Sequence, residues 1–131
     1  MNMQPIQNIQ APISLGELID KITILQIKTQ HLQGAALEHV TAELNALQAT
    51  LDGLHLNIDS KLVQRLKEVN QDLWHIEDNI REQERQKNFG DIFIQLARSV
   101  YHQNDQRSAI KKEIDTSYGS AFTEEKSYRP Y

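Results

Sequence analysis

Residues 93–114 read FIQLARSVYHQNDQRSAIKKEI, and this stretch decides both the fold and the region where a functional site is expected. Its apolar side chains recur at steps of three and four residues, which is the spacing of one face of an α-helix. The same face also carries Asn104, Arg107 and Lys111. Because an unpaired charge inside a protein core is prohibitively costly, the rest of the fold must supply these cations with counter-charges or a ligand.

The same apolar spacing occurs in three earlier segments, which are separated by turn signals. The first begins with Ser14-Leu-Gly-Glu17, a capping box in which the Ser14 hydroxyl accepts from an amide and Glu17 reaches back. No segment alternates between apolar and polar residues as a strand does. We predict one helix from Ser14 to near Gly34, a second that ends at about Asp52, a third from Ser60 to Lys87, and a fourth from Asp91 to about Asp115.

These segments predict an all-α protein, a compact antiparallel bundle of about four helices. We expect one helical domain, 1–131, with a flexible N-terminus at 1–12 and an ordered C-terminal tail at 120–131. An elongated coiled-coil hairpin that dimerises is the alternative shape. Ile24 and Ile27 lie opposite the main apolar seam of the first helix. A helix that is apolar on two sides is either central in the bundle or covered by something more, here the tail or a second subunit.

Composition excludes several classes of protein. Fourteen Lys and Arg against eighteen Asp and Glu give a net charge of −4, which does not suit a nucleic-acid binder. Without cysteine, the chain has no disulfide, thiolate metal site or cysteine nucleophile. The longest apolar-rich stretch, residues 13–25, is too short and too charged to span a membrane. Because the N-terminus also lacks a secretory signal pattern, we expect a cytoplasmic protein.

The third and fourth predicted helices should form a hairpin in which a polar seam faces a polar seam. Residues whose numbers sum to about 177 then lie opposite each other, as neighbours in an antiparallel pair do. This places Asn70 near Arg107. It also positions Glu77 and Asp78 to neutralise Arg107 or Lys111.

Three interpretations of this seam stay open. It is an ionic network that fixes helix register, a cleft for a polar or anionic small molecule, or a surface that recognises another protein. In the cleft, Arg107 and Lys111 would hold a carboxylate or phosphate while Trp74 or Tyr101 stacks on a ring. The candidate ligand-binding residues are Asn70, Trp74, Glu77, Arg81, Arg98, Tyr101, Asn104, Arg107 and Lys111.

The tail carries the motif EEKSY at 124–128. We expect it to be ordered and to act as a lid or latch on the cleft, held by Lys21, Lys28 or Arg98. The candidate latch residues are Glu124, Glu125, Lys126 and Tyr128.

The five histidines include no pair four residues apart, and Asp72 with His75 is a single imperfect copy of a di-metal motif. The sequence therefore predicts no metal site and no cofactor. A glycine-rich phosphate loop and a nucleophile elbow are also missing.

Five segments together resemble a known family: SLGELIDKITIL at 14–25, LWHIEDNIR at 73–81, FIQLARSVY at 93–101, NDQR at 104–107 and EEKSY at 124–128. They are similar to a family of small bacterial proteins classed as a domain of unknown function. The resemblance implies a glycan-related role by association, without a mechanism. It also implies that the shared polar positions, with Glu17, Asp20 and Lys21 of the first predicted helix among them, belong to one site or one network.

We therefore expect a non-catalytic helical binding or interaction module with a polar cleft between the third and fourth helices. Its partner would be a polar or anionic small molecule or another protein, and a homodimer is one arrangement. The alternative is a small all-helical enzyme acting on an anionic polar metabolite. There, Arg107, Lys111 and Arg81 would stabilise an anion, and Glu77 or Asp105 would act as acid or base.

Overall fold

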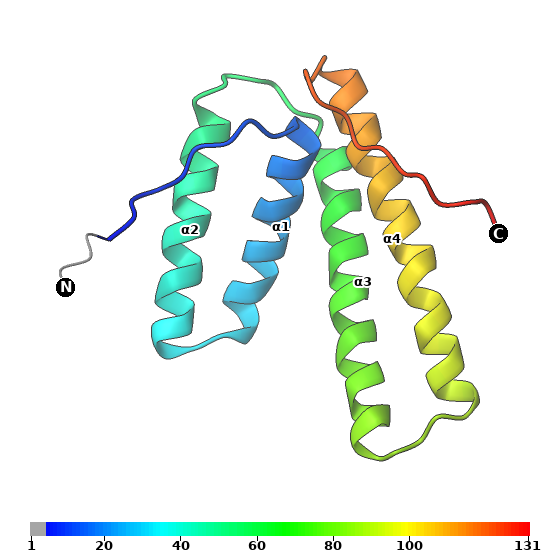
Figure 1. Ribbon diagram of the computed structural model, residues 1–131. Helices are drawn as coiled ribbons and strands as arrows, with labels where there is room; N and C mark the ends of the chain where they lie inside the picture. The colour runs from blue at the N-terminus through cyan, green and yellow to red at the C-terminus, as the bar shows by residue number, and fades with distance from the viewer. Residues whose placement is uncertain (1–4) are drawn as a thin grey trace.

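A computed structural model describes residues 5–131 and contains four helices in chain order, α1 (Leu15–His31), α2 (Gly34–Asp52), α3 (Ser60–Arg85) and α4 (Asp91–Ser117). Consecutive helices run in opposite directions (Figure 1), so the predicted antiparallel all-α bundle is confirmed. The predicted boundaries agree to within about three residues. Residues 1–4 of the predicted flexible N-terminus lie outside the described part, and residues 5–12 form no helix or strand.

Helix α1 is the central element. It contacts α2 on one side and both α3 and α4 on the other, whereas α2 contacts no other helix within residues 5–131 (Figure 1). Consistent with this, α2 has no fully buried side chain, whereas more than half of α1 is buried. The apolar residues on two sides of α1 are therefore explained by its position between two layers.

The hydrophobic core lies between α1, the first half of α3 and the last half of α4. Ile19, Leu66 and Ile114 are fully buried at its centre. Helices α3 and α4 have 26 and 27 residues and α1 has 17, so their hairpin continues past the end of α1 (Figure 1). The bundle therefore has three packed helices at one end and a two-helix hairpin at the other.

Helices α1 and α4 approach each other closely at Gly16. A Cβ atom added there would lie 2.6 Å from the backbone oxygen of Lys111 and 2.8 Å from Oδ1 of Asp115, so only glycine fits. The Oγ of Ser14 accepts from the amide of Glu17 at 3.0 Å, which confirms the capping half of the predicted box. Its reciprocal half is wrong, because the Glu17 carboxylate binds Lys111 instead.

The fully buried carboxylate of Asp115 joins α1, α4 and the tail. Its Oδ1 accepts from the amide of Gly16 at 2.6 Å, and its Oδ2 accepts from the amide of Glu124 at 2.9 Å. The positive end of the α1 dipole favours a carboxylate at this place. The amide of Leu15 donates to Oγ of Ser120 at 3.1 Å, which adds a second link between the tail and the start of α1.

The tail turns back after α4 at Gly119, whose φ of +64° suits glycine, and then runs along α4 (Figure 1). Lys112 pairs with Glu125 at 3.3 Å, and Lys126 pairs with Asp105. The attachment predicted through Lys21, Lys28 or Arg98 is wrong, because the reversed tail lies beside cations of α4 itself. Across residues 5–131, no helix has both the length and the hydropathy that a membrane-spanning segment requires.

We predict that Gly16→Ala lowers the free energy of unfolding by about 2–3 kcal/mol, because the added carbon meets backbone that cannot move aside. The melting temperature followed by circular dichroism should fall by roughly 10 °C. Gly53→Ala is the matched control, since its φ is −65° and it lies at the end of α2. Its effect should stay within about 1 kcal/mol. Equal melting temperatures for Gly16→Ala and wild type would contradict the close approach.

Candidate functional site

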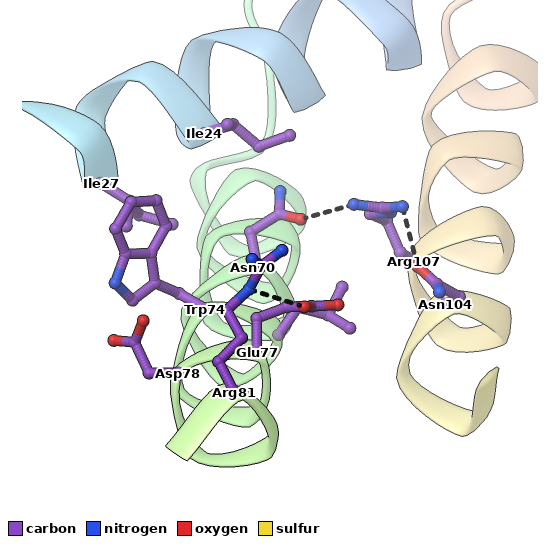
Figure 2. A pocket seen from close by; sticks show the side chains of 10 residues that line it. Ile24, Ile27, Asn70, Trp74, Glu77, Asp78, Arg81, Asn104 and Arg107 are labelled. Atoms are coloured by element: carbon purple, nitrogen blue, oxygen red, sulfur yellow. Dashed lines mark hydrogen bonds and ion pairs between the residues drawn. The ribbon is translucent and has the colours of Figure 1, made fainter. Parts of the chain in front are cut away.

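A cleft of about 520 Å³ opens where the three-helix part gives way to the α3–α4 hairpin (Figure 2). Its volume is typical of a site for a small molecule. Helix α1 supplies an apolar wall, α3 supplies most of the polar groups, and α4 supplies the opposite side. The lining residues are Ile24, Ile27, Asn70, Leu73, Trp74, Glu77, Asp78, Arg81, Asn104 and Arg107.

Most of the candidates named from sequence line this cleft, namely Asn70, Trp74, Glu77, Arg81, Asn104 and Arg107. Three do not. Lys111 is buried in a neighbouring ionic cluster, Tyr101 faces the tail, and Arg98 lines neither this cleft nor the cavity beneath the tail.

The helical pattern alone did not reveal the wall that α1 contributes to the cleft, although the family resemblance had grouped Glu17 and Asp20 with the other polar positions. Gly16, Asp20, Thr23 and Ile27 recur at steps of four, three and four, so they form one helical face directed at α3 and α4. That spacing was visible in the sequence and could have revealed the face. Ile27 is buried within the cleft wall, so neither the tail nor a second subunit is needed to cover it.

Arg107 reaches from α4 across the cleft to α3 (Figure 2). Its Nη1 donates to Oδ1 of Asn70 at 3.3 Å, and its Nη2 donates to Oδ1 of Asn104 at 2.8 Å. The predicted pairing of Asn70 with Arg107 is confirmed. Within residues 5–131, no carboxylate lies within ion-pair distance of this half-buried guanidinium. Its two partners are neutral amides.

Asn70 connects Arg107 to a buried acid on α1. Its Nδ2 donates to Oδ1 of Asp20 at 2.8 Å and to Oγ1 of Thr23 at 2.9 Å, while its oxygen accepts from Arg107. The amide therefore has a fixed orientation, with its oxygen toward α4. Arg107 is held in place by this network, and Asp20 compensates its charge only through an intervening neutral group.

Lys111 has the opposite environment. Its side chain is only 9% exposed, and its Nζ lies 2.6 Å from Glu17, 3.2 Å from Glu124 and 3.7 Å from Asp20. The prediction that Glu77 or Asp78 neutralises a cation of α4 is wrong, because Glu77 pairs with Arg81 on its own helix at 3.6 Å.

The ionic contacts of Lys111 outweigh its burial. Burial alone would lower the pKa of Lys111, but the hydrogen bond to Glu17 and the charges of the neighbouring carboxylates raise it. Burial likewise opposes ionisation of Glu17, and the bond to Lys111 reverses that effect, so the pKa of Glu17 is lowered. Both groups are therefore charged at neutral pH, and Lys111 has no need of an external anion.

Trp74 stacks on the ring of His31, with centroids 4.5 Å apart and an interplanar angle of 21°. Tyr101 has a different partner and packs edge-on against Tyr131 of the tail. The Nε1 of Trp74 is buried and has no hydrogen-bond partner among the described residues. An unsatisfied N–H of this kind costs about 1–3 kcal/mol, which is unusual for a purely structural core.

A second cavity, of about 1100 Å³, lies between α4 and the tail. Asn104 and Arg107 line it as well as the cleft, so the two spaces meet at these residues. On its tail side, Tyr131 donates to Asp105 and Lys126 pairs with it. The hydrogen bond from Lys126 and then that from Tyr131 lower the pKa of Asp105, and the carboxylate raises the pKa of Tyr131 to about 12.

The site can therefore offer a fixed guanidinium, amide groups, an indole ring and aliphatic side chains to a ligand. No three His, Asp or Glu side chains in the described part of the chain converge as a metal site would require.

Comparison with curated proteins and with solved structures gives no match. A family model described as "Family of unknown function (DUF6165)" matches residues 9–130, which include the cleft, the Lys111 cluster and nearly all of the tail. The chain therefore belongs to the family of unknown function DUF6165.

Proposed function

We propose that this protein is a non-catalytic helical binding module whose cleft holds a polar or anionic small molecule through Arg107. The observation that carries the proposal is the environment of that guanidinium. It is half-buried, it borders the cleft, and in residues 5–131 it is hydrogen-bonded to neutral amides. A carboxylate or phosphate in the cleft would supply the missing direct counter-charge.

The two cations of the α4 stripe have different roles in this proposal. Lys111 belongs to the ionic network, since three carboxylates from α1 and the tail surround it. Arg107 belongs to the binding site. The network and the cleft, which the sequence offered as alternatives, thus occupy adjacent turns of one helix.

Preorganisation supports binding at Arg107. Two of its five N–H donors are used by Asn70 and Asn104, which fix the plane of the guanidinium before any ligand arrives. A fixed guanidinium loses little side-chain entropy on binding an anion. Trp74 and Ile24 provide an apolar surface for the uncharged part of the ligand.

The geometry favours binding over catalysis. An acid–base residue works best when its pKa lies near the operating pH, yet contacts from Lys126 and Tyr131 lower the pKa of Asp105. Glu77, the other candidate, forms an ion pair with Arg81. The glycan-related role, the bacterial cytoplasmic setting and the homodimer stay predictions. Because a glycan-related role is predicted, sugar phosphates are among the ligands to be tested.

The proposal is tested by thermal-shift measurements of wild type, Arg107→Ala and Arg98→Ala with inorganic phosphate, dicarboxylates, nucleotides and sugar phosphates. Ligand that binds only the native state raises the melting temperature by mass action. We expect at least one class to stabilise wild type and Arg98→Ala but not Arg107→Ala. Arg98 is the matched control, because it lies on the same helix outside both cavities.

Asn104→Asp provides a variant that should remain folded. It places a carboxylate 2.8 Å from Nη2 of Arg107 without changing side-chain shape, so an internal counter-charge competes with the ligand. We expect its melting temperature to equal or exceed that of wild type and its ligand response to vanish. An undiminished response in Asn104→Asp and Arg107→Ala, or no response of wild type to any class, would refute the proposed function.

Removal of Lys111 should be strongly destabilising, because it leaves three carboxylates clustered without their central cation. Lys111→Ala should cost about 3–5 kcal/mol in urea unfolding, as loss of one member of a buried ion pair does. Lys112→Ala removes an exposed lysine from the next position and should cost less than about 1 kcal/mol. Similar losses in the two variants would mean that Lys111 is not the centre of the network.

The stabilising contribution of Glu17 should depend on pH. Since the pKa of Glu17 is lowered in the folded state, its contribution is fully present above its ordinary value of 4.5 and is lost as pH falls through the lowered value. Glu17→Gln should therefore be less stable than wild type at pH 7 by about 1 kcal/mol, and nearly equal to it at the lowest pH where both fold. A difference that grows on acidification would contradict this sign.

A further inference from the structure

The cleft and the cavity beneath the tail share one cationic residue. Arg107 and its partner Asn104 belong to the linings of both, so the guanidinium stands at the junction of two spaces. A ligand whose anionic group is terminal would place its remainder in one space only. A ligand with an internal anionic group would have substituents on both sides of the guanidinium.

The walls on the two sides suit uncharged or ring-bearing substituents. On the cleft side, Trp74, Ile24 and Ile27 present an indole ring and two aliphatic side chains. On the tail side, Tyr101 and Tyr131 pack edge to face, with ring centroids 5.1 Å apart. Planar or alicyclic rings stack on aromatic side chains, and this site has aromatic side chains on both sides of Arg107.

The charge of the site limits the charge of the ligand. Lys111, the nearest other cation of α4, is already surrounded by Glu17, Asp20 and Glu124. Arg81 lines only the cleft and Arg129 only the tail cavity, so a phosphate monoester at the junction, with nearly two negative charges at neutral pH, would meet these acids with one guanidinium beside it. A phosphodiester carries one negative charge, which one guanidinium matches.

We propose that the ligand is a small phosphodiester whose linking phosphate binds Arg107, with one substituent in the cleft and the other beneath the tail. The inference rests on the proposed function and adds the class of ligand and its position. The tail thereby becomes a wall of the binding site as well as a segment fastened to α4.

Isothermal titration calorimetry with matched probes tests this inference. The dinucleoside monophosphate ApU has rings on both sides of a diester, whereas AMP and uridine represent its halves. Glycerophosphocholine and glycerol 3-phosphate form a second pair without rings. We expect each diester to bind wild type at least ten-fold more tightly than its monoester, with ApU the tighter of the two diesters.

A variant that fills only the tail cavity separates the two sides. Ser108 lines that cavity and not the cleft, so Ser108→Phe should abolish the preference for ApU while leaving the affinity for AMP unchanged. Ala109→Phe is the matched control, because Ala109 is exposed and lines a separate groove with Arg65 and Glu68. It should leave both affinities unchanged.

The possible outcomes distinguish this inference from the proposed function. Binding that depends on Arg107 but shows no preference for diesters, or a preference that survives Ser108→Phe, would overturn the inference alone. Absence of binding by every one of these probes would likewise overturn the inference, and binding unaffected by Arg107→Ala would overturn both.

Discussion

The Lys111 ammonium draws together segments that are distant in the chain. Glu17 and Asp20 come from the first helix and Glu124 from the tail, and all three carboxylates lie within 4 Å of the one nitrogen. The contact is possible because Gly16 lets α1 approach the backbone of α4 where any larger residue would collide. Once α1 is fixed there, the positions of Asp20 and Thr23 determine the orientation of Asn70, and Asn70 determines that of Arg107.

This order of dependence explains why Arg107 and Lys111, one turn apart on α4, have such different environments. Lys111 lies level with the acidic first turns of α1, so it finds its counter-charges within the fold. Arg107 lies level with Asn70, at the edge where the three-helix core gives way to the cleft. Burying a guanidinium among amides is tolerable only where it stays partly solvated or meets an anion. Lys111 is therefore neutralised within the fold, whereas Arg107 stays available to a ligand in the cleft.

Local sequence patterns were sufficient to predict the helices, their antiparallel order and the meeting of Asn70 with Arg107. The pairing of Asn70 with Arg107 could be predicted because the position of the turn in a helical hairpin determines which residues lie opposite each other. The partners of Lys111 were not predictable in the same way. Glu17 is 94 residues away in sequence, and its approach depends on how closely α1 and α4 pack. Similarly, Trp74 stacks on His31 because α1 ends beside Trp74, and no pattern within α3 shows where α1 ends.

Among the described helices, α2 packs on α1 alone, and none of its side chains is fully buried. Local opening of α2 therefore exposes one face of α1 and leaves the contacts among α1, α3 and α4 intact. Its amides would be expected to exchange with solvent hydrogen well before those around Leu66 and Ile114. Thermal fluctuations of α2, or changes in its sequence, therefore have little effect on the geometry around Arg107.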